Sequence, residues 1–551
     1  MSPRHTRRQF LSRAAAAGLM LPAVTRHALA QSAPTTALAR FLFLDDAFVE
    51  SGRGFERIFH RPKKAGLIQE SDGQPWQLGD QTSVVRDPGG RFHMTYRVAW
   101  PDPGVRGLHP GIGDDKAHWL RQSTAYAFSE DGIKWTRPTL GLIDGPVSFQ
   151  PAPEAKWKDG VFFEPTAISR QNNLGCPLHL IHDLQEFGNV TNSSRRYLIN
   201  YLEFADTHPF AEISDGGLYF AGTVPGFVGN PRWRNGLEVI WEGPHRGPRG
   251  PATRVAGWDP QWQVWFDCAQ STFGDWLKRG GRDISRWTTK DFQNWSRGEL
   301  AIPLREDESR APEDWVEYMD FRAFPVNDFW LGQLIVFHGD RRNDQAEMPT
   351  RRGVWRKGTT EMRLLLSRDA GRTWGRLGGT GPWIPHHEAD AGFDRLVFTA
   401  SPVHVADELW LYYACWDGDH LVWNRDGTSY YPNRARVPRT ARAVLRWDGF
   451  VSLRAGADAA EMLSKPITSR QRLTVNAVVS AGGSLKAEVL GPDGLPLKGF
   501  KLKDCTALTG NGLALPITWG GKEQLPRKHY NKPVRLRFEF SQADFFGFQW
   551  V

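Results

Sequence analysis

The chain has 551 residues, a formal net charge of +8 at pH 7, 24 tryptophans and 32 phenylalanines. This length exceeds that of a typical small domain. The widely spaced cysteines form no Cys-x-x-Cys pair, which excludes zinc-ribbon and thioredoxin motifs and favours buried free thiols, and there is no run of five or more Lys or Arg to indicate a nucleic-acid partner.

The N-terminal segment, up to Ala30, has the pattern of an export signal. Residues 6–11 read Thr-Arg-Arg-Gln-Phe-Leu, an apolar stretch covers residues 14–24, and Ala-Leu-Ala ends at Ala30. This order is typical of a removable twin-arginine signal peptide. We therefore predict a periplasmic or secreted protein. The apolar stretch is shorter than the roughly 20 residues that span a bilayer, so we expect no stable membrane anchor. Removing five arginines would leave a charge of 8 − 5 = +3.

From residue 40 to residue 450 the sequence is a series of short strand-like runs separated by Gly, Pro, Asp and Asn. Examples are residues 91–97, 196–204, 333–338 and 408–415. Sustained helical periodicity is hard to find in this region. The pattern predicts an all-β fold of many short strands.

A weak repeat runs through the same region. A strand ends in Ser or Thr, an Asp-containing turn follows, and a Trp closes the unit, in residues 129–135, 289–295 and 367–374. The last copy, Ser-x-Asp-x-Gly-x-Thr-Trp, is an Asp box, in which Asp caps a tight turn. The interval from Trp135 to Trp295 is about twice the interval from Trp295 to Trp374. This spacing corresponds to a period of roughly 80 residues and predicts a five-bladed β-propeller over residues 31–452.

The last hundred residues differ from the repeat. Alternating strands at residues 473–479, 485–490 and 534–540 are joined by Gly-Gly and Pro-Asp-Gly turns. This arrangement predicts a C-terminal β-sandwich over residues 453–551. Its sparse loop aromatics favour a bracing role for this domain.

Several motifs resemble those of secreted bacterial proteins related to five-bladed propeller glycoside hydrolases of the arabinanase, invertase and levanase type. They are Leu-Phe-Leu-Asp-Asp at 42–46, Arg-Ile-Phe-His-Arg-Pro at 57–62, residues 83–97, and Asp-Gly-Phe-Val-Ser-Leu at 448–453. The resemblance implies an exported glycoside hydrolase with a carbohydrate substrate and no cofactor beyond a structural calcium. The invertase Trp-x-Asn-Asp-Pro-Asn-Gly motif and a Glu-Cys-Pro motif are missing.

Hydrolysis of a glycosidic bond uses two carboxyl groups, one as acid and one as base or nucleophile. By analogy with the propeller enzymes, these groups lie just before or early in the inner strand of different blades. We predict Asp80 as base or nucleophile. Glu164 is predicted as general acid, since apolar neighbours would favour its protonated form. Asp320 would orient the sugar, with Arg322 on the same strand face as a partner.

Other polar residues are predicted to bind substrate. The acids among them lie just before or early in a candidate inner strand, except Asp183, which like the histidines lies at the end of a strand. These residues are Glu317, Arg322, Asp259, Asp394, His182, Asp183 and His338.

Two other functions stay open. A non-catalytic carbohydrate-binding or surface propeller would show exposed aromatic side chains and no carboxyl pair. A sialidase-like enzyme, which the Asp boxes suggest, would need an arginine triad and a nucleophilic tyrosine. No sequence feature indicates the oligomeric state, and no nucleic-acid partner or zinc site is expected.

Overall fold

The computed structural model describes the part of the chain after the predicted signal, with gaps. The described residues are 40–73, 80–87, 89–101, 120–138, 180–183, 197–203, 215–221, 237–241, 255–271, 282–290, 296, 298–311, 313–340, 357–379, 381–387, 393–416 and 438–551. The predicted signal peptide, residues 1–30, lies outside them. Across these ranges, no helix has the length and hydropathy needed to cross a membrane.

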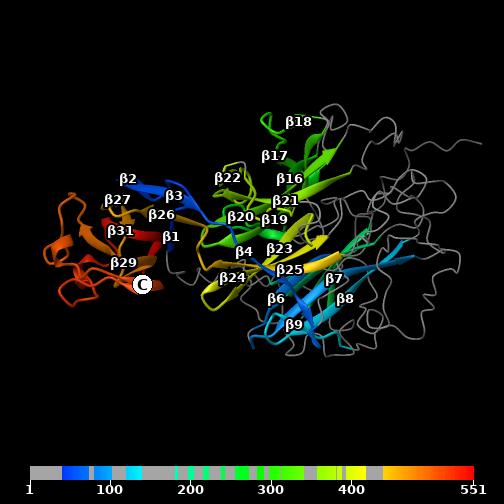
Figure 1. Cartoon of the computed structure of the whole chain (residues 1–551), viewed down its shortest axis with the longest axis horizontal. Helices are drawn as coiled ribbons and strands as arrows, with labels where there is room; N and C mark the ends of the chain where they lie inside the picture. Colours follow the sequence, from blue (N-terminus) through cyan, green and yellow to red (C-terminus); the bar gives the residue numbers. More distant parts are fainter. Residues whose placement is uncertain are drawn as a thin grey trace, which may run out of the picture. The chain divides into compact units, whose positions relative to one another are not determined.

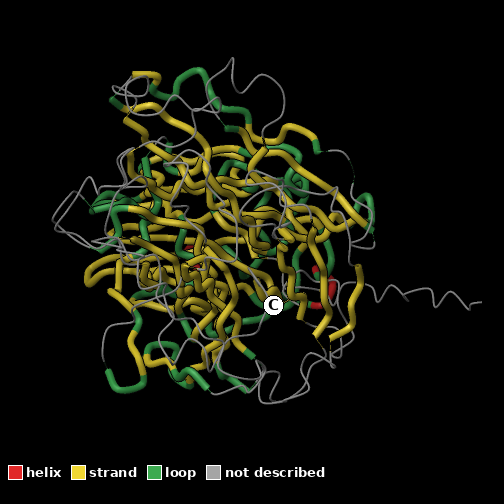
Figure 2. The backbone as a smooth tube through the Cα atoms, turned by 90° about the vertical axis from the view of Figure 1, so that its right-hand side faces the viewer, coloured by secondary structure: helices red, strands yellow, loops and turns green. Residues whose placement is uncertain are grey.

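Strands dominate the described residues, which confirms the all-β prediction. Figure 2 shows strands and loops almost throughout, and the helical segments η3 (Leu502–Asp504) and η4 (Arg527–His529) are single 3-10 turns. The strands are rich in β-branched and aromatic side chains, which pack well on a pleated surface. One example is β20 (Phe329–Asp340), in which every residue from Leu331 to Phe337 is buried.

Among the described residues between 63 and 446, strands form five antiparallel sheets in a propeller-like arrangement. Apart from one early strand that joins the last sheet, the strands of each sheet are neighbours along the chain, as in a blade. The first sheet contains β6 (Asp80–Arg86), β7 (Phe92–Pro101) and β8 (Leu120–Ser129), and the second contains β10 (Leu180–Asp183), β11 (Tyr197–Glu203), β12 (Asp215–Ala221) and β13 (Leu237–Trp241). The third contains β14 (Val255–Asp259), β15 (Val264–Ser271), β16 (Asp283–Thr289) and β17 (Glu299–Ile302), and the fourth contains β18 (Arg310–Ala311), β19 (Asp314–Val326), β20, β21 (Lys357–Ser367) and β22 (Gly375–Leu377). The fifth contains β23 (Leu396–Val405), β24 (Glu408–Trp416), β25 (Pro438–Arg446) and β4 (Lys63–Leu67). A separate parallel pair joins β5 (Gln69–Glu70) to β9 (Lys134–Trp135).

The sheet of β23, β24 and β25 is completed by a strand from the other end of the chain. Strand β4 pairs antiparallel with β25, with Lys64 opposite Ala443. A strand from near the N-terminus is therefore the edge strand of this sheet, whose other three strands come after those of the other four sheets in the sequence.

Strands of different sheets contact one another. Strand β6 contacts β10 and β23, and β19 contacts β14 and β23. Each of these five is the first strand of its sheet except β19, which follows the two-residue strand β18. Apolar side chains fill the space between adjacent sheets. One core joins Val84 and Phe92 to Trp410 and Tyr412, and another joins Phe266 to Phe321 and Leu334. Cys268, Cys415 and Cys505 are buried free thiols, as expected.

The C-terminal strands form a nine-stranded sheet that includes three strands from the N-terminal side. Figure 1 shows β2 (Val49–Arg53) and β3 (Phe55–Phe59), in blue, beside β26 (Val451–Ala455), β27 (Ala460–Ser464) and β31 (Pro533–Trp550). Strand β1 (Arg40–Leu42) pairs with β31, so that Phe41 lies opposite Phe548. The remaining strands are β28 (Ile467–Thr468), β29 (Leu473–Leu490) and β30 (Gly510–Pro516). Residues 40–59, which the sequence placed in the propeller, thus hydrogen-bond to the C-terminal strands.

The nine-stranded sheet encloses its own core because its two longest strands bend. The register of β29 and β31 shifts between Val479 and Ser484, and Gln542 has a positive φ of 43°. The bend brings side chains of one strand together. Phe538 and Phe545 of β31 have ring centroids 4.9 Å apart, and both are fully buried.

The Asp-box turn at residues 367–374 forms as predicted. Ser367 Oγ donates to Asp369 and accepts from the Gly371 amide at 2.8 Å, and Asp369 accepts from the Thr373 amide at 2.9 Å. Gly371 has φ +77°, a conformation that favours glycine. Trp374 packs its ring against Phe321. The turn at residues 129–135 repeats these contacts, whereas most of the one at 289–295 lies outside the described residues.

We expect Asp369→Ala to lower the free energy of unfolding by about 0.5–1.5 kcal/mol, because it removes the hydrogen bonds that Asp369 accepts from Thr373. Urea unfolding would measure the change. Asp328→Ala is a matched control, since Asp328 is an exposed turn acid and should change stability by less than about 0.5 kcal/mol. Equal effects of the two substitutions would contradict this account of the turn.

Candidate functional site

Strand β19 carries the charged residues that form the candidate site. The sequence predicted Glu317 and Asp320 just before a strand at residues 322–326, but the strand begins at Asp314, so both acids lie within it. The carboxylates of both residues and the guanidinium of Arg322 are close to nine-tenths buried. A β-bulge between Tyr318 and Asp320 interrupts the alternation of side chains. A bulge of this kind redirects side chains locally.

Hydrogen bonds tie this face of β19 to the first strands of two other sheets. Thr399 Oγ1 of β23 donates to Asp320 Oδ2 at 3.1 Å, and the Phe321 amide donates to Asp320 Oδ1 at 2.8 Å. Arg322 Nη1 donates to Ser401 Oγ at 2.7 Å, and the Val84 amide of β6 donates to the same oxygen at 2.9 Å. These contacts fix the orientations of Asp320 and Arg322. The predicted pairing of these two residues with each other stays a prediction.

The same contacts set the relative direction of two of these strands. Asp320 meets Thr399, and Arg322 meets Ser401 two residues later on both strands, so β19 and β23 run in parallel. Asp80 is the first residue of β6, four residues before Val84. The side chain of Asp80 lies outside the described residues.

Three further predicted residues also fall outside the description. Glu164 is in an undescribed segment, and the side chains of His182 and Asp183 are undescribed, although their backbone forms β10. Their roles stay predictions.

Asp259 lies elsewhere than predicted. It was expected before an inner strand, but it ends β14, and residues 264–271 form the second strand of that sheet. Its carboxylate is only 1% exposed and accepts hydrogen bonds from Arg286 at 2.9 Å and Arg372 at 2.6 Å. It also accepts the Gln261 amide in the β14–β15 turn. These contacts make Asp259 a turn cap and an ion-pair partner.

Asp394 does precede an inner strand, as predicted, but it is completely buried in a polar cluster. Lys64 Nζ lies 2.7 Å from its carboxylate, Tyr413 donates to it at 2.8 Å, and His387 Nδ1 also contacts it. Burial, reinforced by the Asp394 carboxylate, raises the pKa of Tyr413 far above its usual range. Lys64 comes from β4, so this cluster links the early strand to the last sheet.

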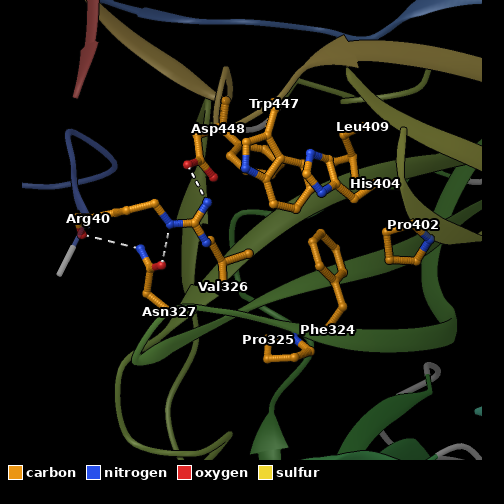
Figure 3. A pocket seen from close by; sticks show the side chains of 11 residues that line it. Arg40, Phe324, Pro325, Val326, Asn327, Pro402, His404, Leu409, Trp447 and Asp448 are labelled. Atoms are coloured by element: carbon orange, nitrogen blue, oxygen red, sulfur yellow. Dashed lines mark hydrogen bonds and ion pairs between the residues drawn. The ribbon is translucent and has the colours of Figure 1, made fainter. Parts of the chain in front are cut away.

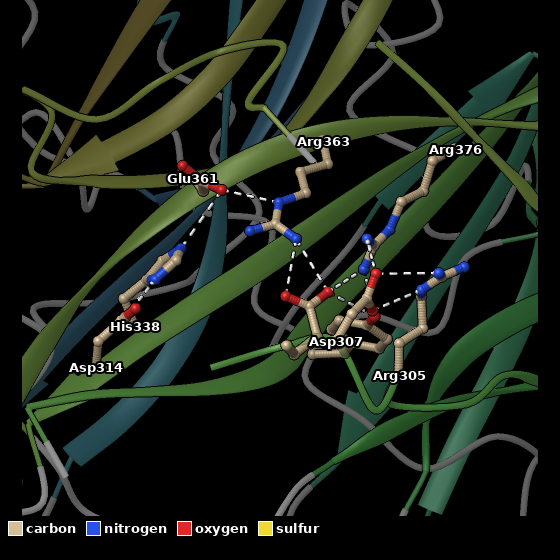
Figure 4. A network of polar contacts seen from close by, with 9 residues as sticks. Arg305, Asp307, Asp314, His338, Glu361, Arg363 and Arg376 are labelled. Atoms are coloured by element: carbon tan, nitrogen blue, oxygen red, sulfur yellow. Dashed lines mark hydrogen bonds and ion pairs between the residues drawn. The ribbon is translucent and has the colours of Figure 1, made fainter. Parts of the chain in front are cut away.

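His338 belongs to a charged network that crosses one sheet (Figure 4). Its Nδ1 lies 2.7 Å from Asp314 Oδ1 and its Nε2 lies 3.4 Å from Glu361 Oε1. Arg363 then bridges Glu361 at 2.8 Å to Glu308 at 3.0 Å. Burial lowers the pKa of His338, but the two carboxylates outweigh it and raise that pKa overall. For Glu361, burial raises the pKa, and His338 and Arg363 reverse the effect and lower it.

These directions set a pH window for the bridge. Because the pKa of His338 is raised in the folded state, its charged contacts add to the free energy of unfolding. This contribution is full below about pH 6.5, the pKa of His338 in the unfolded chain, and it is lost as the pH rises through the pKa of the folded state. The lowered pKa of Glu361 gives stability above about pH 4.5 that is lost on acidification. We expect His338→Gln to destabilise the protein more at about pH 5.5 than at about pH 9 in urea unfolding.

His529→Gln is the control for this pH effect. Burial, and then the nearby charge of Lys528, lower the pKa of His529, so any stabilisation from its neutral form is lost as pH falls. The destabilisation caused by His529→Gln should therefore not become smaller as the pH rises. An equal cost of His338→Gln at both pH values would contradict the charged bridge.

A cavity of about 360 Å³ lies at the opposite end of β19 (Figure 3). Phe324, Trp447 and His404 line it, with Arg40 and Asp448 at one side. The Trp447 ring has two partners, since His404 stacks on it with ring centroids 3.7 Å apart and the Arg40 guanidinium carbon lies 5.5 Å from its centroid. Arg40 is bound to Asp448 at 2.6 Å. Glu317, Asp320 and Arg322 are not among the residues that line this cavity.

The chain is similar to several solved structures. An N-acetylgalactosamine deacetylase from F. plautii is 14% identical, with 72% of this chain and 97% of that chain covered and a TM-score of 0.39. An exo-β-1,3-galactanase from Phanerochaete chrysosporium is 9% identical, with 90% and 99% covered and a TM-score of 0.33. The catalytic domain of a GH62 α-L-arabinofuranosidase from Coprinopsis cinerea is 11% identical, with 70% and 97% covered and a TM-score of 0.35.

Glycoside hydrolases are thus among the solved structures to which this chain is similar. No family model and no curated protein sequence matches it.

Sequence reasoning missed several residues that the structure places in these polar clusters. They are Lys64, Glu308, Asp314, Glu361, Arg363, Thr399 and Ser401. The one available signal was charge within a strand, as in Glu361-Met-Arg363, where residues two apart share a face. The threonine and serine carry no comparable signal.

Proposed function

We propose that the protein is an exported glycoside hydrolase that cleaves glycosidic bonds in a polysaccharide or oligosaccharide. The observation that carries the proposal is the buried group of Glu317, Asp320 and Arg322 on β19, which hydrogen bonds tie to β23 and β6, the first strands of two other sheets. Fixed carboxylates with limited solvent access suit acid–base chemistry at a sugar.

The proposed architecture is a closed five-bladed propeller followed by a β-sandwich. Five sheets and the contacts of β6 with β10 and β23, and of β19 with β14 and β23, support a ring of first strands around a funnel. The bent nine-stranded sheet with an enclosed core supports the sandwich. In this arrangement Asp80, Glu164 and Asp320 come from different blades.

The proposed roles follow the chemistry of a carboxylate pair. Asp80 acts as base or nucleophile, and Glu164 protonates the leaving oxygen. Asp320, already oriented by Thr399 and the Phe321 amide, binds a sugar hydroxyl and positions the ring. Glu317, whose carboxylate lies 3.5 Å from Arg282, adds a second acceptor on the same strand.

The remaining predictions for binding and location belong to the same proposal. His182, Asp183 and His338 would contact substrate at the rim, and the twin-arginine signal would carry the protein to the periplasm or beyond. A structural calcium at the propeller centre stays an expectation. In the described ranges, no group of three or more His, Cys, Asp or Glu side chains could hold a metal ion.

One observation favours the alternative of a non-catalytic carbohydrate-binding protein. Trp262 is 63% exposed in the β14–β15 turn, and Arg372 lies 5.7 Å from its ring. An exposed indole beside a fixed cation is a surface on which a sugar ring could stack.

A substrate screen tests the proposal. Purified protein from residue 31 onward would be incubated with plant, algal and bacterial polysaccharides and with aryl glycosides, and released reducing sugar would be measured. Release of product from any of them supports the hydrolase. Binding to a polysaccharide without release from any substrate would favour the binding protein.

A further inference from the structure

The positive charge of the protein is concentrated in its C-terminal region. Residues 453–551 contain 14 Lys and Arg and 8 Asp and Glu, which gives a net charge of 14 − 8 = +6. Residues 31–452 contain 50 Lys and Arg and 53 Asp and Glu, which gives a net charge of 50 − 53 = −3. Residues 498–532, here called the basic segment, hold seven of those cations and two acids, a net charge of 7 − 2 = +5. The seven are Lys498, Lys501, Lys503, Lys522, Arg527, Lys528 and Lys532.

All seven cations are exposed, and both acids of the basic segment have other partners. Asp504 accepts a hydrogen bond from the Lys501 amide at the start of η3, and Glu523 lies 3.6 Å from Arg472. Within the part of the chain that the structure describes, none of the seven forms an ion pair. Their charge is therefore available to a partner in solution.

The basic segment is held rigidly although it contains little regular structure. Trp519 is buried and its Nε1 donates to the Ala487 carbonyl at 2.8 Å. The Gly520 amide donates to the Asp504 carbonyl at 2.8 Å, which holds the loop of Lys501 and Lys503 beside the turn that precedes Lys522. Cations displayed on a fixed surface lose less conformational freedom when they bind.

We propose that the basic segment binds an acidic polysaccharide through its uronate or sulfate groups. This inference rests on the proposed function, whose substrate class it narrows. A polymer with regularly spaced negative charges can engage several cations at once. Proteins that bind single-stranded nucleic acid commonly stack the bases on exposed aromatic side chains, but Trp519, the tryptophan of the basic segment, is buried. Attachment to a membrane surface commonly uses a basic amphipathic helix, and the segment's helical parts are single 3-10 turns.

Affinity electrophoresis of the purified full chain in gels that contain polygalacturonate or dextran sulfate tests this proposal. The test variant carries Lys501→Gln, Lys503→Gln and Lys522→Gln. The control carries Lys63→Gln, Lys134→Gln and Lys290→Gln, which removes the same charge from exposed lysines elsewhere. At about 0.1 M salt we expect the test variant to bind at least about tenfold more weakly and the control to bind like wild type. At about 1 M salt, where the Debye length is about 3 Å, binding of all three should be lost.

Several outcomes would overturn the inference. The first is that neither polyanion retards the wild type, and the second is that the test variant is retarded as strongly as the wild type. The third is that duplex DNA or phosphatidylglycerol vesicles bind as tightly as the polyanions through the same three lysines. The assay reads binding without hydrolysis, so it is independent of the substrate screen. A protein that binds polygalacturonate but releases no sugar from any substrate of the screen would favour the binding protein over the hydrolase and leave the basic segment as a polysaccharide-binding surface.

Discussion

Asp80→Asn and Glu164→Gln should each lower kcat by about 10²–10⁴-fold on the substrate identified in the screen, with the fold unchanged. Each amide has nearly the shape of the carboxyl group but can neither give nor take the proton. Turnover would be measured together with far-UV circular dichroism. Asp320→Asn should have a smaller effect of about tenfold, because its proposed role is to hold the sugar.

The leaving group distinguishes the two proposed roles. An aryl glycoside with a phenol of low pKa departs without protonation, so Glu164→Gln should retain more activity on it than on a polysaccharide. Asp80→Asn should be poor on both. Asp328→Asn is the control, since this exposed acid lies in the β19–β20 turn and its substitution should leave kcat unchanged. Wild-type turnover in both Asp80→Asn and Glu164→Gln would remove this carboxyl pair from the mechanism.

Phe545→Ala should lower the free energy of unfolding by about 3–5 kcal/mol. Phe545 is fully buried in the core of the nine-stranded sheet, and its ring lies 4.8 Å from Phe43 and 4.9 Å from Phe538. The substitution removes a ring at the bend of β31, where both halves of the sheet meet. Thermal or urea unfolding followed by near-UV circular dichroism would show the change.

Leu495→Ala is the control for Phe545→Ala. Leu495 is 65% exposed in a turn of the same region, so its truncation should change stability by less than about 0.5 kcal/mol. A cost below about 1 kcal/mol for Phe545→Ala would mean that the two halves of the sheet do not share a core.

The features that the sequence predicted well depend on local patterns. Strands and Asp-box turns are determined by residues within a few positions of one another, as at Ser367, Asp369 and Gly371. The strand that includes Arg322 followed from the same kind of pattern, although it begins earlier than expected and also includes Asp320.

Pairing between distant parts of the chain could not be predicted in this way. Nothing near Phe41 indicates Phe548 as its partner, and nothing near Lys64 indicates Ala443 or Asp394. Asp259 was misplaced for a local reason. The run Trp-Asp-Pro-Gln-Trp around it fits either the start of a strand or a hairpin turn, and only the pairing of Trp258 with Trp265 shows that it is a turn.

The pairing of early with late strands has a consequence for biogenesis. Strands β1 to β4 are made first, but their partners β25, β26, β27 and β31 come only near the end of the chain. At about 5–20 residues per second, synthesis of the whole chain takes roughly half a minute to two minutes, and for most of that time these strands have unpaired edges. Such high contact order predicts slow folding that is completed only after release from the ribosome. A translocation route that accepts finished, folded proteins would suit a chain of this topology.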